Sequence, residues 1–259
     1  MKELTEEHLD FLNHHGFDAV QFENWRNGVA EGWYSRANNR VKGELLAPEG
    51  GSILDLPRRD TAECQEIVGL GEKTLARGEL GVVILNGGMA TRFGGGVKGT
   101  IKVLGERSFL GLKLEDVGQA QERAGKKIPV YLMNSFATAT ETEKHLKDHD
   151  YYGLSPQQVT LFNQFASARM QKDGDLFLDD DGNISPYGTG HGDLVPAFRQ
   201  AGCLASFIKS GGRYLFVSNV DNLGAQISPT ILGHHVKHET DVTVEVTPKW
   251  PGDAGGSPF

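Results

Sequence analysis

The feature that most constrains this sequence is an apolar run that ends in a glycine-rich loop followed by a lysine. Residues 82–85 are uniformly apolar, which is typical of a strand buried in a parallel sheet. Glycines then occupy half of positions 87–96, and Lys98 comes shortly after. Successive backbone amides in such a loop form a concave anion site, and a lysine adds a point charge for phosphate. The stretch predicts a strand followed by a nucleotide-phosphate loop, with a flexible surface loop as the alternative.

Two well-known phosphate-binding patterns do not match this loop. The Walker pattern needs a lysine followed directly by Ser or Thr at the start of a helix, whereas Lys98 is followed by Gly99. The dinucleotide pattern G-x-G-x-x-G lacks its third glycine after Gly87 and Gly88. The second mismatch argues against a dinucleotide-dependent oxidoreductase.

Strands and helices alternate after the loop. The predicted helices cover 108–123, 138–149 and 194–200, and the predicted strands cover 82–85, 128–135, 159–164, 214–223 and 241–246. This order predicts an α/β fold with a doubly wound, mostly parallel sheet. We expect an N-terminal helical segment over residues 1–75 and a nucleotide-binding catalytic domain over 76–259. Because ligands bind at the carboxyl ends of such strands, the 87–98 loop and residues 133–135 should share one rim.

Composition restricts the classes of partner. The net charge of −8 argues against a nucleic-acid-binding surface, and no run of 18 apolar residues is present to span a membrane. The first residues are too acidic and polar for a signal peptide, and the two cysteines, Cys64 and Cys203, are far apart. We therefore expect a cytoplasmic protein without a disulfide framework.

Two segments could suggest metal binding but favour plainer interpretations. The aspartate-rich stretch 171–183 lacks the closing glutamate of a calcium loop, so we expect a β-hairpin turn between short strands. His14 and His15 are adjacent and point in different directions on a helix, so a surface pair is expected.

Polar residues at strand ends are the candidate ligand contacts. Gln164 follows an apolar strand, and its carboxamide can both donate to and accept from a pyrimidine edge, although a plain polar strand end is the alternative. Asp221 also follows an apolar strand, where a carboxylate is costly unless it is paired or binds a cation; capping of the next turn is the alternative. His191 lies among three glycines, which indicates backbone packed close to another group or an exposed turn.

These motifs together resemble those of the UTP-dependent sugar-1-phosphate uridylyltransferases, also called UDP-sugar pyrophosphorylases. The similar stretches are 85–88, 91–99, 190–193 and 219–223, in that order, and the resemblance covers roughly residues 70 to 257. The Gly-His-Gly-Asp turn is similar to that of members that use glucose 1-phosphate. The sequence departs from the family at Ala90, where glycine is usual, and at Val97, where proline is frequent.

The resemblance implies a Rossmann-like nucleotidyltransferase fold and an enzyme that makes UDP-hexose and pyrophosphate from UTP and a hexose 1-phosphate. It implies Mg²⁺ as cofactor. The implied roles are nucleotide binding by Leu85, Asn86, Gly87 and Gly88, charge neutralisation by Lys98 and Arg92, uridine selection by Gln164 and Gly190, sugar-phosphate binding by His191 and Asn219, and metal binding by Asp221.

The resemblance also implies that the sheet of this family continues beyond residue 259. The expected activity is UTP–hexose-1-phosphate uridylyltransfer. The alternative is a non-catalytic uridine-nucleotide-binding fragment or subunit, which needs a second chain to supply the C-terminal part. A related nucleotidyltransferase with another base also stays open.

Overall fold

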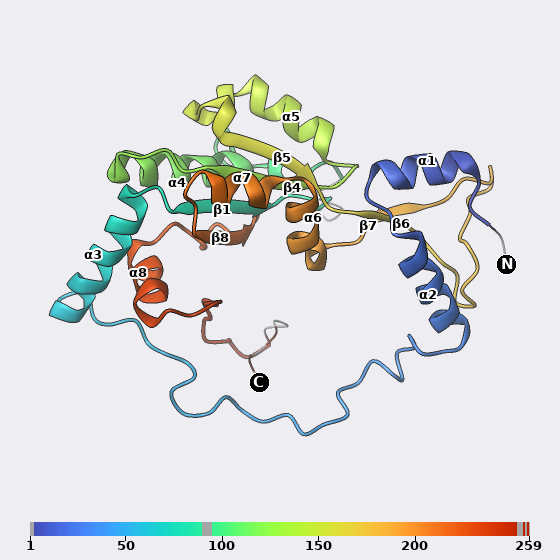
Figure 1. The fold of residues 1–259 in the computed structure, drawn as a ribbon, viewed down its shortest axis with the longest axis horizontal. Coiled ribbons are helices and arrows are strands. Elements are labelled where there is room, and N and C mark those ends of the chain that lie inside the picture. Colours follow the sequence, from blue (N-terminus) through green and yellow to red (C-terminus); the bar gives the residue numbers. More distant parts are fainter. Residues whose placement is uncertain (1–2, 90–94, 253–255, 257, 259) are drawn as a thin grey trace. The chain divides into compact units, whose positions relative to one another are not determined.

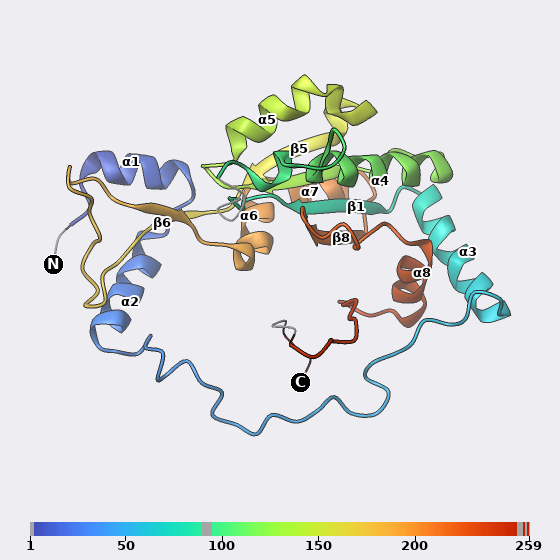
Figure 2. The same ribbon diagram turned by 180° about the vertical axis from the view of Figure 1, so that it is seen from behind.

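The computed structural model describes residues 3–89, 95–252, 256 and 258. The chain forms two compact units (Figure 1; Figure 2). The first unit comprises Met1–Trp33 and Leu75–Ile227, and the second comprises Tyr34–Thr74 and Ser228–Phe259. Among the described residues, no helix combines the length and apolar character needed to cross a bilayer.

The first unit is built on a four-stranded parallel sheet. Its strand order is β5 (Val159–Asn163), β4 (Val130–Asn134), β1 (Leu80–Leu85) and β8 (Tyr214–Asn219). Strand β1 pairs in parallel with both β4 and β8, so Leu85 lies opposite Met133 on one side and Asn219 on the other. The predicted parallel α/β sheet is confirmed, with the strand before the glycine loop at its centre.

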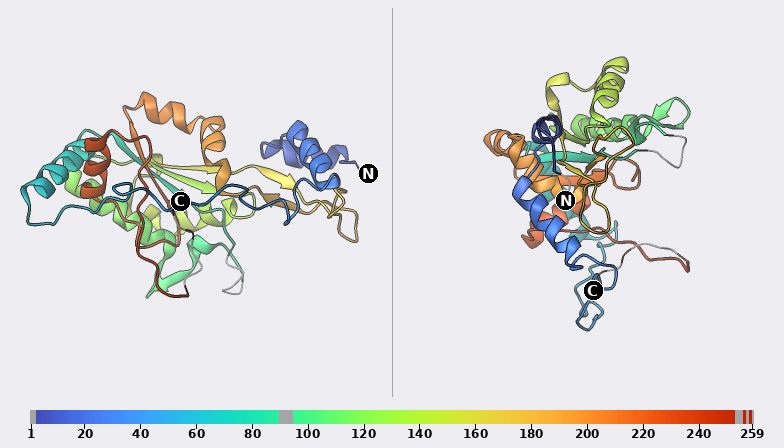
Figure 3. Two further views of the ribbon diagram at one scale, coloured as in Figure 1. Left: turned by 90° about the horizontal axis from the view of Figure 1, so that it is seen from below. Right: turned by 90° about the vertical axis from the view of Figure 1, so that its right-hand side faces the viewer.

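Helices cover both faces of this sheet (Figure 3). Helices α4 (Phe109–Ala124) and α5 (Ala139–Asp148) lie on one face, and α6 (Leu194–Gln200) and α7 (Cys203–Lys209) lie on the other. On the face that α6 and α7 cover, the structure has a buried apolar cluster that includes Val83, Tyr131, Phe162, Phe198 and Phe207. Because side chains alternate along a strand, β1 contributes Val83 and Leu85 to this side and β4 contributes Tyr131 and Met133.

Local sequence signals explain where α4 begins and ends. The Ser108 hydroxyl accepts a hydrogen bond from the Gly111 amide at 3.0 Å, which caps the first turn. Gly125 then ends the helix with φ of 63°, a left-handed conformation that glycine adopts without steric cost. The helix predicted over 108–123 is thus confirmed, while α7 was not predicted.

Smaller elements extend the first unit. They are the hairpin of β2 (Lys102–Leu104) and β3 (Arg107–Ser108), the hairpin of β6 (Ala166–Ala168) and β7 (Pro186–Gly188), helices α1 (Glu6–His14) and α2 (Ala19–Ala30), and the short turns η2 (Lys98–Thr100), η3 (Asp150–Gly153), η4 (Pro156–Gln158) and η5 (His191–Asp193). Helices α1 and α2 contribute Leu12 and Phe22 to a second apolar cluster with Ala166 and Ala168 of β6. In the aspartate-rich stretch, antiparallel bridges join Met170 to Leu176 and Leu178 to Ile184.

The second unit holds α3 (Ala62–Ala76, whose last two residues belong to the first unit) and α8 (Pro229–His238). The helices approach closely at glycines, because a methyl group on Gly71 would come within 2.7 Å of the Pro229 carbonyl carbon. The Lys237 ammonium also lies 3.3 Å from the Glu66 carboxylate.

The strand predicted over residues 241–246 is wrong. This segment has no regular structure, and Val242 and Val244 are 76% and 72% exposed. Alternation of valines with polar residues indicates one apolar face, but a strand is stable only with a hydrogen-bonded neighbour. Among the described residues none pairs with this segment.

Candidate nucleotide-binding site

The carboxyl ends of the sheet strands form one rim, as predicted. The Asn86 amide donates to the Met133 carbonyl at 2.7 Å, and the Ser135 hydroxyl donates to the Gly87 carbonyl at 3.1 Å. On the other side of β1, the Val220 amide donates to the Leu85 carbonyl at 3.1 Å. The start of the glycine loop is therefore fixed between the ends of β4 and β8.

Lys98 and Asp221, which are 123 residues apart, meet at this rim. The Lys98 ammonium lies 2.9 Å from the Asp221 carboxylate, and the two side chains are 32% and 37% exposed. The Lys98 amide donates to the Gly88 carbonyl at 3.1 Å, so η2 is joined directly to the glycine loop. Since the Asp221 carboxylate pairs with Lys98, the alternative in which it only caps the next turn is not what the structure shows.

The Asn86 side chain packs against η2, the turn that begins at Lys98. Its side chain is fully buried and donates to the side-chain oxygens of Asn134 and Thr142, both at 2.8 Å. The opposite face of its carboxamide lies against Gly99, where any side chain would overlap Asn86 Oδ1. The Asn86 side chain therefore makes its contacts inside the protein.

Gln164 connects three segments of the rim. Its side chain is buried, and its Oε1 accepts a hydrogen bond from the Gly190 amide at 3.1 Å. A methyl group on Gly87 would come within 2.8 Å of Gln164 Nε2, and one on Gly188 would come within 2.9 Å of Gln164 Cδ. A side chain at either position would therefore require the Gln164 carboxamide to shift. The carboxamide group is held in one orientation between the loop after β1 and the turn that precedes α6.

The His191 turn is fixed by Gly190, which the sequence analysis selected, and by Thr189 and Asp193, to which it gave no role. Gly190 has φ of 104°, and the Thr189 hydroxyl bonds to the Asp193 carboxylate and, at 3.1 Å, to the Phe165 carbonyl. Burial raises the pKa of the Asp193 carboxyl above its ordinary value. The sequence signal for this arrangement was residues 186–189, which precede the turn and differ from the family pattern.

The remaining predicted site residues are less constrained. His191 is exposed at the start of η5, and Asn219 is exposed at the end of β8, opposite Leu85. The structure gives no hydrogen bond between these two side chains in the part of the chain that it describes. Arg92 lies outside the described residues.

Asp221 fits a magnesium ion that arrives with a nucleotide. Mg²⁺ in nucleotide sites is bound through one or two carboxylates and completes its shell with phosphate oxygens and water. Within the described ranges, no group of three or more His, Cys, Asp or Glu residues could hold a metal without such a partner. A single exposed carboxylate beside a phosphate loop is thus the donor set expected for this cofactor.

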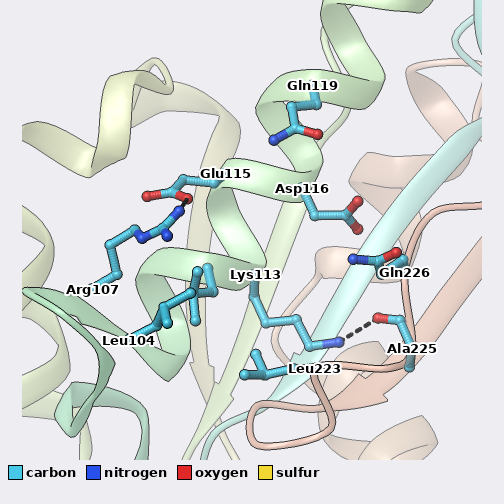
Figure 4. Close-up of a pocket in the computed structure, with 10 residues that line it drawn as sticks. Leu104, Arg107, Lys113, Glu115, Asp116, Gln119, Leu223, Ala225 and Gln226 are labelled. Atoms are coloured by element: carbon cyan, nitrogen blue, oxygen red, sulfur yellow. Dashed lines mark hydrogen bonds and ion pairs between the residues drawn. The ribbon is translucent and has the colours of Figure 1, made fainter.

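A lysine that the sequence analysis did not select is buried close to this rim. Lys113 on α4 is only 4% exposed and borders a cavity of about 280 Å³ between α4, the β2–β3 hairpin and the segment after Asp221 (Figure 4). Its sequence signal was its position on the apolar face of α4, at helical spacing from Leu110 and Val117.

The fold and the rim define an open, parallel α/β protein, a class in which ligands bind beyond the carboxyl ends of the strands. The model of the UTP–glucose-1-phosphate uridylyltransferase family (UDPGP) matches residues 51–257. The chain belongs to this family, as the motif order indicated.

Relatives and solved structures agree with this assignment. The chain is 38% identical over 182 residues to UTP–glucose-1-phosphate uridylyltransferase 2 of Dictyostelium discoideum, covering 69% of this chain and 36% of the relative. The Hordeum vulgare enzyme is 34% identical over 182 residues, covering 69% of this chain and 38% of that protein. The chain thus spans a little over a third of the curated relatives it matches.

Two solved structures show a similar fold. A variant of UDP-glucose pyrophosphorylase from Leishmania major in complex with UDP-glucose matches with a TM-score of 0.57 and 27% identity, covering 65% of this chain and 36% of that chain. A structure described as a "putative UDP-N-acetylglucosamine pyrophosphorylase" from Entamoeba histolytica matches with a TM-score of 0.63 and 24% identity, covering 68% of this chain and 47% of that chain. The second likeness concerns the fold alone.

Proposed function

We propose that this chain provides the nucleotide-binding part of a uridylyltransferase that makes UDP-hexose and pyrophosphate from UTP and a hexose 1-phosphate. The observation that supports this most is the Lys98–Asp221 ion pair beside the glycine loop. An ammonium group and a carboxylate meet there at one point of the rim, which supports phosphate binding by the first and metal binding by the second. Matched relatives named UTP–glucose-1-phosphate uridylyltransferase favour glucose 1-phosphate as the sugar substrate.

In the proposed reaction, an oxygen of the sugar phosphate attacks the α-phosphorus of UTP, and the bond to pyrophosphate breaks. The nucleophile is already an anion, so no general base is required. Catalysis then depends on positioning and on charge neutralisation. Lys98 is placed to turn from Asp221 towards the triphosphate, and Arg92 is proposed to assist it. Mg²⁺, held by Asp221 together with phosphate oxygens, would supply further neutralisation of the phosphates.

The other rim residues select and orient the substrates in this proposal. Backbone groups from Leu85 to Gly88 hold the nucleotide. The fixed carboxamide of Gln164, together with Gly190, recognises the uracil edge, and this role is supported by the single orientation that the neighbouring glycines impose. His191 and Asn219 orient the sugar phosphate, which is consistent with their exposure at the rim.

A second candidate is a uridine-nucleotide-binding piece that needs another chain for turnover. The observation that favours it is coverage, since the chain spans 36% of the Dictyostelium relative. In either case we propose action in a reducing cytoplasm, which the buried free thiols of Cys64 and Cys203 support.

The test is pyrophosphate release by the 259-residue chain with UTP, Mg²⁺ and glucose 1-phosphate. We expect turnover that Lys98→Ala and Asp221→Ala abolish and that Lys127→Ala, an exposed lysine after α4, leaves unchanged. If turnover is absent, calorimetric UTP binding that Lys98→Ala weakens supports the second candidate. A chain that binds no UTP contradicts both.

A further inference from the structure

Lys113 is buried on α4 and is not a member of the Lys98–Asp221 ion pair. A buried ammonium group is costly unless hydrogen bonds and charges compensate it. Lys113 Nζ donates to the Ala225 carbonyl at 2.5 Å and lies 6.0 Å from the centre of the Phe216 ring on β8. Burial lowers the Lys113 pKa, and the nearby carboxylates of Asp116 and Asp221 oppose that shift.

Asp116, one helical turn after Lys113, holds the same segment. Its carboxylate accepts a hydrogen bond from the Ile227 amide at 2.9 Å. Two opposite charges on one helix therefore bind a carbonyl and an amide that are two residues apart. Figure 4 shows both side chains beside the cavity, with Lys113 pointing at Ala225.

The segment from Asp221 to Ile227 is anchored at both of its ends. At its start, the Val220 amide donates to the Leu85 carbonyl, and at its end α4 holds Ala225 and Ile227. Between these ends the backbone amides of the described segment make short-range bonds, from Leu223 to the Asp221 carbonyl and from Ala225 to Asn222 Oδ1, while the Asp221 carboxylate pairs with Lys98. The α4 anchors consequently restrict where the Asp221 carboxylate can lie.

Stability does not explain a lysine at this place. Replacing a buried ion by an apolar side chain of similar volume is often neutral or stabilising, and the neighbouring inward residues of α4 are apolar. Lys113 instead donates its hydrogen bond to the Ala225 carbonyl, in the segment that carries Asp221. This points to a role in the site rather than in the core.

We propose that Lys113 and Asp116 are positioning residues, which hold the 221–227 segment so that Asp221 can bind the metal of a metal–nucleotide complex. The proposal rests on the function proposed above. It predicts the direction in which cation binding at Asp221 changes when Lys113 is replaced. Removing the Lys113 charge alone would strengthen cation binding at Asp221, because one repulsive cation is lost. Loss of positioning weakens it instead.

The experiment is calorimetric titration of the 259-residue chain with UTP, once with Mg²⁺ and once with EDTA. The readout is the gain in UTP affinity that Mg²⁺ confers. We expect Lys113→Met to reduce this gain about tenfold, as loss of an outer-shell partner of a metal ligand typically does. Affinity in EDTA should stay within about twofold, and Lys127→Met, on an exposed lysine, should match the wild type in both titrations.

A second measurement does not depend on nucleotide binding. Hydrogen exchange of the ligand-free chain should show faster exchange of the 221–227 amides in Lys113→Met than in Lys127→Met. If Lys113→Met does not fold, Asp116→Ala, which removes the acceptor of the Ile227 amide, should lower the Mg²⁺ gain and speed exchange at Ile227.

The outcomes separate the two proposals. A wild-type chain without UTP binding, or without a Mg²⁺ gain that Asp221→Asn removes, contradicts the proposed function, while the exchange data still test the anchor. If the wild-type chain shows this Mg²⁺ gain and a folded Lys113→Met variant shows an equal or larger gain, the positioning role alone is overturned. If only Asp116→Ala folds, an unchanged Mg²⁺ gain overturns the positioning role.

Discussion

Replacing Gly111 by alanine should expose how tightly η3 is packed on α4. A methyl group at Gly111 would lie 2.6 Å from Cε1 and 2.8 Å from Cζ of Tyr152. The ring cannot withdraw easily, because its hydroxyl bonds to Ser108 at 3.0 Å and to His145 at 2.7 Å. The backbone of Tyr152 has a left-handed φ of 53°, which restricts it further.

The magnitude follows from two opposing effects. Alanine gains about 1 kcal/mol over glycine in a helix interior. Overpacking a filled site costs about 1–3 kcal/mol. Gly118 lies two turns further along α4 and has only Leu154 Cδ2, at 3.9 Å, near its would-be methyl group, so Gly118→Ala carries the propensity gain alone. Gly111→Ala should therefore be less stable than Gly118→Ala by about 1–3 kcal/mol.

The assay is urea unfolding followed by far-ultraviolet circular dichroism. Both alanine substitutions are made in the wild type and in a Tyr152→Ala background, which removes the ring. In that background the two variants should have equal free energies of unfolding. The double-mutant cycle therefore isolates the contact between the alanine at position 111 and the Tyr152 ring. Equal stabilities of Gly111→Ala and Gly118→Ala in the wild type would refute the reasoning.

Three further predictions follow from the same geometry. Gly188→Ala should displace the Gln164 carboxamide and weaken UTP binding about tenfold in equilibrium dialysis, as expected for the loss of one hydrogen-bonded contact; unchanged affinity would argue against base recognition by Gln164. Burial, with the neighbouring His149, lowers the pKa of His145 below its unfolded value, so the folded state binds fewer protons and stability falls as pH drops below about 6.5. Urea unfolding at pH 7.5 and about pH 5.5 should show a smaller loss for His145→Gln, and an equal loss would contradict this cause. Gly71→Ala should open the α3–α8 contact and speed proteolysis there. Gly69→Ala should not, because its methyl group would enter open space. Equal digestion of the two variants would count against the close contact.

Much of the rim could be predicted because it depends on strand ends. Apolar runs locate β1, β4, β5 and β8, and parallel strands bring their carboxyl ends to one edge. That reasoning predicted that the glycine loop and residues 133–135 share one rim, whereas the placement of Asp221 at the same site as Lys98, 123 positions away, followed only from the family resemblance. The motif order then agreed with the family that the chain matches.

Features that depend on neighbours could not be predicted in this way. The valine alternation over 241–246 indicates an apolar face but does not show which strand would pair with it. Lys113 was overlooked because a lysine in a helix is normally solvent-facing, and its burial depends on the distant Ala225 carbonyl. The start of α8 had a usable signal in Ser228 and Pro229, a capping serine followed by a proline at the first helical position.

The pairing of α3 with α8 has a consequence for synthesis of the chain. About 150 residues separate the end of one helix from the start of the other, so ribosomal elongation between them takes on the order of 10 s. During that interval the face of α3 that carries Ile67 and Gly71 has not yet met its helical partner. The β1-centred sheet acquires its last strand, β8, shortly before α8 is made. Co-translational folding should therefore complete the sheet first, leaving nascent α3 as a site for chaperone binding.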